Sequence, residues 1–310
     1  MRNRTVGRLL TPAVAAVALV ALAGIATAGD LVRLVRMKLS AGDLASGEAA
    51  VESYRSANGG DAEYLDAVGW LARGAQMLGR SELAAGWVAE LRREIPAETP
   101  ETVVPLGAGI EVEGKLRAAR NGRGDALRFL ESEYARAKDV ALRSRIRKNV
   151  NLLAIEGQTA PEIGYADGVG PARPRLAEFK SKPVLVFLWA ARCGDCKAQA
   201  PAVAAVWRKY SSRGLALVAP TRFYGRDTEG RPAGPAEEKT AIESAWAESY
   251  KGLEGVPVPI DTETMVRYGA SATPTFALVD RAGVVRFYAP TRLTEAALSQ
   301  RVEEALADAP

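Results

Sequence analysis

The only two cysteines of the chain, Cys193 and Cys196, lie in the stretch WAARCGDCK (189–197). Cysteines with two residues between them could form a redox-active dithiol, half of a metal site, or a structural disulfide. A structural disulfide fits poorly, because closing so short a loop constrains the unfolded chain little. A metal site also fits poorly, because the chain has no histidine to complete the ligands. The pair therefore predicts thiol–disulfide chemistry, with no metal and no cofactor.

The two cysteines stand where a predicted strand leads into a predicted helix. Residues 183–190 form a continuous apolar run of strand length, and residues 196–214 have a helical pattern. A second buried strand is predicted at 215–221, which completes a right-handed strand–helix–strand unit. The helix N-terminus carries partial positive charge and stabilises a thiolate at Cys193. We therefore predict that Cys193 is the nucleophile and that the more buried Cys196 is the resolving thiol.

Thr273 and Pro274 begin a second informative region, a predicted hairpin at 272–290. A proline directly before a central strand is a poor strand residue but suits a tight cis peptide bond. Such a bond would leave the Thr273 backbone free to pair with an extended substrate segment opposite Cys193. The alternative is an ordinary trans proline in a turn. An amphipathic helix is predicted to close the chain at 294–309.

Taken in order, these residues resemble the thioredoxin superfamily. Trp189 precedes the first cysteine by four residues, as in WxxxCxxC, and Pro201 follows the second by five. The segment that includes VPVPID (256–261) resembles the central insertion of exported TlpA/ResA-type reductases. The resemblance covers about residues 160–309. It implies an α/β thioredoxin-like fold and dithiol–disulfide exchange with protein thiols and disulfides.

Three positions depart from the pattern of that family. Phe187 stands where thioredoxin has a buried aspartate, Gln199 where the ResA branch often has a glutamate, and Arg192 where tryptophan is usual. The resemblance implies that the two acids move protons for the resolving thiol, so water or Asp195 is left to substitute. Because the aromatic residue is missing at position 192, we expect partner recognition to differ.

Asp195 also bears on the direction of electron flow. A carboxylate beside Cys193 disfavours its thiolate, whereas Arg192 and Lys197 favour it. A less stable thiolate gives a more reducing couple, so we predict a protein disulfide reductase rather than an oxidase. One alternative is a helical-repeat binding scaffold with a catalytically weak thioredoxin-like module. Another is a peroxidase of the peroxiredoxin type, which would need a threonine where Ala190 stands.

Residues 1–28 are predicted to be a signal peptide or a membrane anchor. Three arginines and no acid precede an apolar run at residues 9–28, which ends in ATA before Gly29. The run is also long enough to span a bilayer uncleaved. Either alternative places residues 29–310 outside the cytoplasm, in the periplasm or another extracytoplasmic space, and limits membrane contact to this segment. Without these three arginines the net charge falls from +4 to +1, so nucleic-acid binding is not expected.

Residues 29–157 are predicted to be all-α. The segments 64–79 and 81–96 carry apolar residues at three- and four-residue steps and resemble a tetratricopeptide-like helical hairpin. An unrelated helical bundle is the alternative. Stacked hairpins would offer a concave surface to a peptide or protein. Three aromatic side chains could line that surface or pack in the core: Tyr64, Trp70 and Trp87.

The remaining segments connect and extend these domains. A linker rich in glycine and proline is predicted at 158–175, followed by the thioredoxin-like domain at 176–310 with an insertion at 221–258. The first part of the insertion, 222–239, is expected either to overhang the active edge as a partner-selecting flap or to be a plain surface loop. The expected partners are a client protein and a membrane or periplasmic electron donor.

Overall fold

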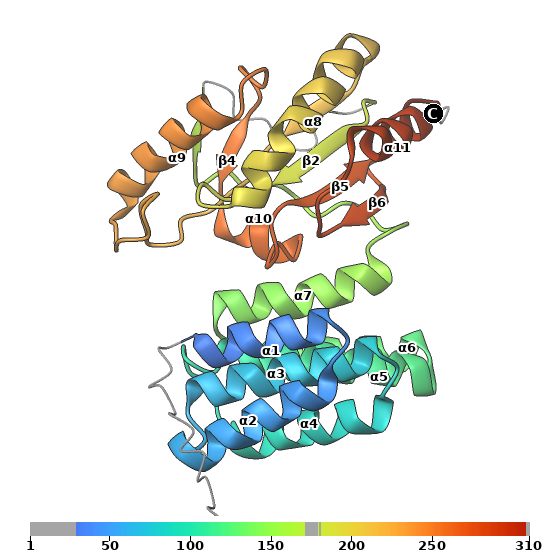
Figure 1. The fold of residues 1–310 in the computed structure, drawn as a ribbon. Helices are drawn as coiled ribbons and strands as arrows, with labels where there is room; N and C mark the ends of the chain where they lie inside the picture. The colour runs from blue at the N-terminus through green and yellow to red at the C-terminus, as the bar shows by residue number, and fades with distance from the viewer. Residues whose placement is uncertain (1–28, 171–178, 180, 308–310) are drawn as a thin grey trace, which may run out of the picture.

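The computed structural model describes residues 29–170, 179 and 181–307. The predicted signal peptide or anchor at 1–28 and the last residues of the predicted linker lie outside this range. An all-helical N-terminal lobe is followed by an α/β C-terminal lobe (Figure 1). Within the described residues, none of the helices has both the length and the apolar character needed to cross a membrane.

The N-terminal lobe confirms the all-α prediction. Asp43, Asp61 and Asp139 each accept a hydrogen bond from a backbone N–H in the first turn of the helix that follows, which fixes where those helices begin. Consecutive helices pack as hairpins, with α3 also against α1 and α5, and α7 against α5. The helices described here are α1 (Asp30–Ser40), α2 (Leu44–Asn58), α3 (Ala62–Met77), α4 (Ser81–Glu94), α5 (Val103–Asn121), α6 (Arg123–Arg136) and α7 (Val140–Ala154).

Small residues let the helices of this lobe approach closely. Ala72 on α3 and Ala84 on α4 are fully buried in one shared cluster. Tyr64 is also buried in the core, and Trp70 and Trp87 pack against the same clusters. These aromatic side chains therefore serve packing within the lobe. The stacking of hairpins is compatible with tetratricopeptide-like repeats, and that repeat assignment stays a prediction.

The C-terminal lobe contains a four-stranded sheet in the order β3-β2-β5-β6. Strand β2 runs parallel to β3 and antiparallel to β5, and β5 and β6 form a hairpin. These pairings confirm the strand–helix–strand unit and the hairpin predicted from the sequence. The elements are β1 (Asp167–Val169), β2 (Val184–Leu188), α8 (Gly194–Tyr210), a 3₁₀ turn (Ser211–Arg213), β3 (Ala216–Val218), α9 (Pro235–Ser249), β4 (Val258–Ile260), α10 (Thr262–Arg267), β5 (Thr275–Val279), β6 (Val285–Ala289) and α11 (Glu295–Ala307).

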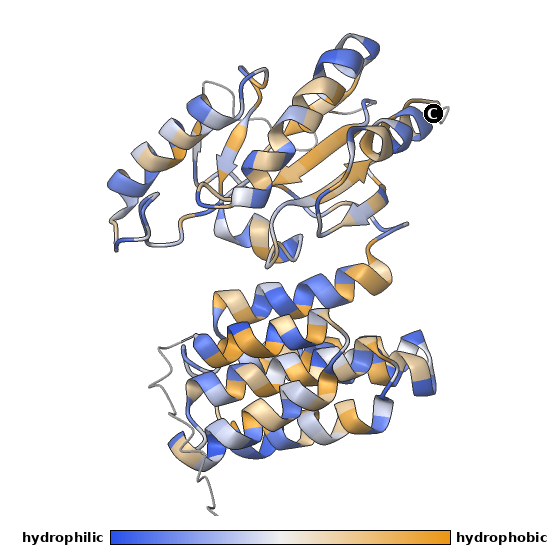
Figure 2. Cartoon of the chain, viewed as in Figure 1, coloured by the Kyte–Doolittle hydropathy of each residue, from blue (hydrophilic) through white to orange (hydrophobic). Residues whose placement is uncertain are grey.

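Both faces of the central sheet are covered, which is why β2 is apolar throughout (Figure 2). Leu185 and Phe187 point into the core formed with α8, α9 and α11. Val184 and Val186 point into a second core on the opposite face, formed with α10 and its following turn. Alternate residues of β2 thus contribute to both cores. Helix α8 packs on one face of the sheet, and the cysteines lie at its start, just after the end of β2.

The predicted linker pairs with β6 near its start and with the insertion farther on, where β1 and β4 form a separate two-stranded sheet. Gly157 N–H donates to the Val285 carbonyl at 2.8 Å, and Ala160 N–H donates to the Gly283 carbonyl at 2.8 Å, so the start of the predicted linker pairs along β6. Farther on, β1 pairs antiparallel with β4. The pairing with β6 has a physical reason, because the exposed edge of a sheet offers unpaired backbone groups that a neighbouring segment can satisfy. The insertion contributes α9 and β4.

Helix α7 joins the two lobes and packs against α10 (Figure 1). The Asn151 side chain donates to the Arg267 carbonyl at 3.0 Å, and Arg143 lies 3.4 Å from Glu263. Gly269, with φ of +63°, brings its backbone directly against the backbone of Lys148. The helical lobe is therefore docked on the face of the sheet that carries α10, opposite the face covered by α8.

Candidate active site

Cys193 is the N-cap residue of α8, and Cys196 lies in the first turn of that helix. The two residues form a disulfide with a Cα–Cα distance of 5.1 Å. The Cys196 N–H donates to Cys193 Sγ at 3.0 Å, so the sulfur occupies the position at which a helix N-terminus favours negative charge. Cys193 is half-buried, whereas Cys196 is fully buried. Of the two sulfurs, only that of Cys193 lies where a partner could reach it.

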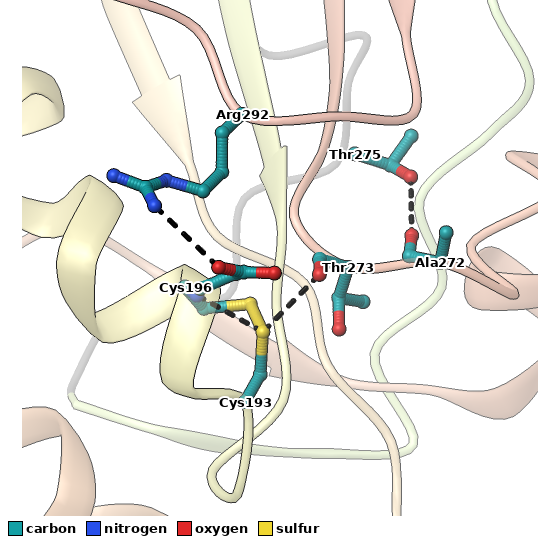
Figure 3. Close-up of a disulfide and its surroundings, with 7 residues drawn as sticks. Cys193, Cys196, Ala272, Thr273, Thr275 and Arg292 are labelled. Atoms are coloured by element: carbon teal, nitrogen blue, oxygen red, sulfur yellow. Dashed lines mark hydrogen bonds and ion pairs between the residues drawn. A yellow bond between two sulfur atoms is a disulfide. The ribbon is translucent and has the colours of Figure 1, made fainter. Parts of the chain in front are cut away.

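The Thr273–Pro274 peptide bond is cis, as the sequence predicted. Cys193 Sγ lies 3.2 Å from the Thr273 carbonyl oxygen, although 80 residues separate the two positions along the chain (Figure 3). Thr275 Oγ1 donates to the Ala272 carbonyl at 2.6 Å. This hydrogen bond links the residues on the two sides of the Thr273–Pro274 bond. The start of β5 and the start of α8 therefore meet at the disulfide.

Trp189 holds the end of β2 in place beneath the site. Its indole N–H donates to the Ala219 carbonyl at 3.0 Å, and its ring is fully buried. The ring lies 5.0 Å from that of Trp246 and 4.6 Å from that of Tyr250, measured between centroids. Burial raises the pKa of Tyr250. Trp246 and Tyr250 come from α9 and its end, and no local sequence pattern indicates that the insertion packs against Trp189.

The two positions that lack the acids expected from the family are filled by side chains with other structural roles. Phe187 is fully buried and stacks on Phe276, with ring centroids 5.3 Å apart. The Gln199 carboxamide donates to the Leu293 carbonyl at 2.8 Å and accepts from the Leu293 N–H at 2.9 Å. Neither side chain offers an ionisable group to Cys196.

Asp195 points away from the core and forms an ion pair with Arg292, with 3.5 Å between Oδ1 and the guanidinium. Arg292 belongs to the loop between β6 and α11 and approaches the start of α8 (Figure 3). Sequence reasoning missed Arg292, because 97 positions separate it from Asp195 and no local motif marks it. The pair is exposed, so the charge of Asp195 at the cysteines is partly compensated and screened.

Arg192 and Pro201 complete the residues singled out from the sequence. Arg192 is exposed and lines a cavity together with Cys193 and Thr273. Pro201 lies inside α8 and is exposed. Because proline has no N–H, it leaves one backbone carbonyl of the preceding turn without its helical partner. The structure thus brings Trp189, Arg192, Asp195 and Thr273 around the cysteines and places Pro201 one to two turns farther along the helix.

Comparison with known proteins agrees with this geometry. Residues 155–300 match the Redoxin family model. The chain is 26% identical over 149 residues to the thiol-disulfide oxidoreductase ResA of Geobacillus thermodenitrificans, covering 47% of this chain and 76% of that protein. It is 30% identical over 132 residues to the Bacillus subtilis ResA, covering 42% of this chain and 64% of that protein.

Among solved structures, the chain is similar to a putative thiol:disulfide interchange protein DsbE from Chlorobium tepidum. It is 24% identical, covers 49% of this chain and 98% of its own, and superposes with a TM-score of 0.40. The Redoxin match falls on the C-terminal half, where the strand β2, the cysteines at the start of α8 and the cis proline before β5 are found. These matches support the assignment of that half of the chain to the TlpA/ResA type of the thioredoxin superfamily, as a thiol–disulfide oxidoreductase.

Proposed function

We propose that this chain is an exported protein disulfide reductase, with Cys193 as nucleophile and Cys196 as resolving thiol. The observation that carries the assignment of roles is the contrast between the two sulfurs. Cys193 Sγ sits at the N-terminus of α8 and 3.2 Å from the Thr273 carbonyl, whereas Cys196 is fully buried. A client disulfide can therefore meet only Cys193.

The reaction proceeds in two exchanges. In the reduced protein the Cys193 thiolate attacks one sulfur of a client disulfide, forms a mixed disulfide, and releases the other client sulfur as a thiolate that takes up a proton. Cys196 then loses its proton and attacks Cys193 Sγ, which releases the second client sulfur. The client gains two electrons, and the protein is left with the Cys193–Cys196 disulfide seen here. An electron donor in the same compartment must reduce that disulfide again.

The Thr273 backbone is proposed to position the client. An extended client segment that pairs beside the cis proline would bring its cysteine next to Cys193, because Thr273 borders both the sulfur and the adjoining cavity. The proton that Cys196 must lose has no carboxylate partner at Phe187 or Gln199, so water or Asp195 is proposed to accept it.

A trapping experiment tests these roles directly. The Cys196→Ser variant lacks the resolving thiol and should accumulate a mixed disulfide on Cys193, which mass spectrometry of the captured adduct would locate. The Cys193→Ser variant is the matched control and should capture nothing. Capture by Cys193→Ser instead of Cys196→Ser would contradict the assignment of roles.

Insulin reduction in dithiothreitol separates the reductase from the alternative of a binding scaffold with a weak thioredoxin-like module. The wild-type protein should accelerate precipitation of the insulin B chain, and Cys193→Ser should not. A redox titration tests the direction of electron flow, because a potential of about −120 mV would mark a strong oxidant instead.

Export is proposed from the N-terminal sequence, since residues 1–28 have the charge and apolar pattern of a signal or anchor. Expression in a bacterium with two membranes should place the protein in the osmotic-shock fraction if the segment is cleaved, and in the membrane fraction if it stays as an anchor. Recovery in the cytoplasmic fraction would contradict both. The helical lobe is proposed to hold a partner peptide or protein, or to orient the catalytic lobe through α7.

A further inference from the structure

The first part of the insertion, residues 222–234, has a defined shape and is tied to α9. Both carboxylate oxygens of Glu238 accept backbone hydrogen bonds, from the Tyr224 N–H at 2.6 Å and from the Gly225 N–H at 2.8 Å. Farther along, Asp227 Oδ1 accepts from the N–H groups of Glu229 and Arg231, both at 2.9 Å. The carboxylate of Glu238 therefore fixes the base of the loop, and the carboxylate of Asp227 fixes its tip.

This loop lies across Arg192, the residue directly before the nucleophilic cysteine. A side-chain carbon added at Gly230 would stand 2.6 Å from a terminal nitrogen of Arg192, so the loop backbone and the guanidinium are in contact. Arg226 donates to the Gly230 carbonyl at 2.8 Å, which brings a second guanidinium to the same stretch of loop. The insertion thus meets the active-site motif instead of projecting away from it.

A cavity of about 410 Å³ lies between the loop, the residues before Cys193, and Thr273. Its walls carry three arginines, two from the insertion and one from the active-site motif. Its lining includes Arg192, Cys193, Arg222, Arg226, Glu238 and Thr273. The cavity is therefore continuous with the place where a client cysteine must lie to react.

The charge of this cavity is net positive, because three arginines and a single acid, Glu238, line it. Among the described residues, no carboxylate forms an ion pair with Arg192, Arg222 or Arg226. Glu238 is the single acid in the wall, and both of its oxygens are already used by backbone N–H groups. Arg222 packs over the Tyr224 ring, 4.4 Å from its centroid, and keeps its charge at the cavity.

We propose that this cavity, called here the arginine pocket, receives an acidic side chain of the client, one or two residues from the client cysteine. The inference rests on the proposed function and adds the substrate class. Guanidinium groups bind carboxylates with charge-assisted, often bidentate hydrogen bonds. A client segment paired at Thr273 advances about 3.3 Å per residue and alternates its side chains, so a residue that flanks the cysteine reaches the pocket. Arg192 stands where the family usually has tryptophan, and its positive charge favours such clients.

The test uses two matched peptide disulfides that differ only in Glu against Gln beside the cysteine. The reduced full-length protein should reduce the Glu peptide about 3- to 10-fold faster than the Gln peptide at low salt. Raising the salt concentration should shrink the ratio, because the pocket is open to solvent. The double variant Arg192→Gln/Arg222→Gln should bring the ratio close to one.

Arg208→Gln is the matched control, since Arg208 is exposed near the far end of α8 and outside the pocket. It should leave both rates unchanged. A wild-type ratio of one, or a ratio that survives the double variant, would overturn the proposal. Glutathione disulfide is tested as a separate substrate. If the arginine variants slow its reduction but leave the ratio of the Glu and Gln peptide rates unchanged, the pocket binds a small-molecule carboxylate and the peptide assignment is wrong.

A binding measurement separates failure of this inference from failure of the proposed function. Labelled peptides with Ser in place of Cys cannot exchange, yet the oxidised protein should bind the Glu version about 3- to 10-fold more tightly than the Gln version. If neither disulfide is reduced but this preference holds, the reductase assignment fails and the pocket stands. If both disulfides are reduced and no binding preference exists, the pocket assignment fails and the reductase stands.

Discussion

The Gln199 side chain and the Leu293 backbone form a reciprocal pair of hydrogen bonds at 2.8 and 2.9 Å, across 94 positions of sequence. One bond needs a donor on the side chain and the other needs an acceptor, and a carboxamide supplies both. The pair fixes the loop that carries Arg292, the partner of Asp195. The residue that occupies the family's acid position therefore acts here as a positioning residue.

Gln199→Glu is expected to destabilise the protein by about 1–3 kcal/mol at pH 7. A buried carboxylate could accept from the Leu293 N–H but would face the Leu293 carbonyl without a donor. Protonation restores the donor, so the loss should be smaller near pH 4 than at pH 7. Chemical denaturation at the two pH values measures the difference.

Gln300→Glu, on the solvent side of α11, provides the matched control and should change stability by under about 0.5 kcal/mol. The role given to Gln199 would be wrong if the two variants lost the same amount of stability at both pH values.

Asp195→Asn is expected to make the redox couple less reducing, by about 10–30 mV. Removing the carboxylate leaves the Cys193 thiolate more stable, which favours the dithiol over the disulfide. Arg292→Gln should act in the opposite direction, because it removes the cation 3.5 Å from Asp195. Equilibration with a glutathione buffer measures both potentials.

Glu248→Gln removes an exposed acid on α9, away from the cysteines, and should leave the potential unchanged. Shifts of the same sign in the Asp195 and Arg292 variants would contradict an electrostatic effect on Cys193.

Gly269→Ala is expected to weaken the docking of the helical lobe. A Cβ at Gly269 would collide with the backbone of Lys148 on α7, and backbone cannot move aside as a side chain can. Gly283 has a similar φ of +80° but open space around it, so Gly283→Ala isolates the cost of the left-handed backbone, about 1–2 kcal/mol.

Gly269→Ala should lose more stability than Gly283→Ala, and small-angle scattering should show the lobes farther apart in that variant alone. Equal losses and unchanged scattering profiles would show that the contact between α7 and the turn after α10 does not hold the lobes together.

Glu111 is expected to make the stability of the helical lobe depend on pH. Burial alone would raise its pKa, but Lys148, Arg73 and Lys115 together lower it to about 2 from an ordinary value of 4.5. A carboxyl pKa that is lower in the folded state stabilises the protein above pH 4.5, and that contribution is lost as the pH falls toward 2. Burial also lowers the pKa of Lys148, which offsets part of the gain.

Glu111→Gln should therefore cost about 2–4 kcal/mol at pH 7 and less at pH 3, as denaturant unfolding would measure. Glu113→Gln removes a more exposed ion pair with Arg117 on the same helix and should cost under about 1 kcal/mol at either pH. A Glu111→Gln cost that is the same at pH 7 and pH 3 would refute the linkage.

Much of the catalytic lobe could be predicted because its signals are local. The apolar run of β2, the cysteines at the start of α8, and the proline before β5 each depend on neighbouring residues, and the structure has all three. The backbone pairing of the predicted linker could not be read from the sequence. Glycine and proline mark a segment without helical period, but they do not show that its backbone pairs with β6.

The sequence by itself determined the identity and spacing of the two cysteines, the alternation of strands and helices, and the helical character of the first lobe. Covalent spacing and hydrophobic period decide these features over a few residues. Only the tertiary structure decided that Arg292 meets Asp195, that Gln199 binds Leu293, and that the insertion meets Arg192 beside Cys193. Those contacts join segments far apart in the chain, and the packing of helices and loops around one sheet brings them together.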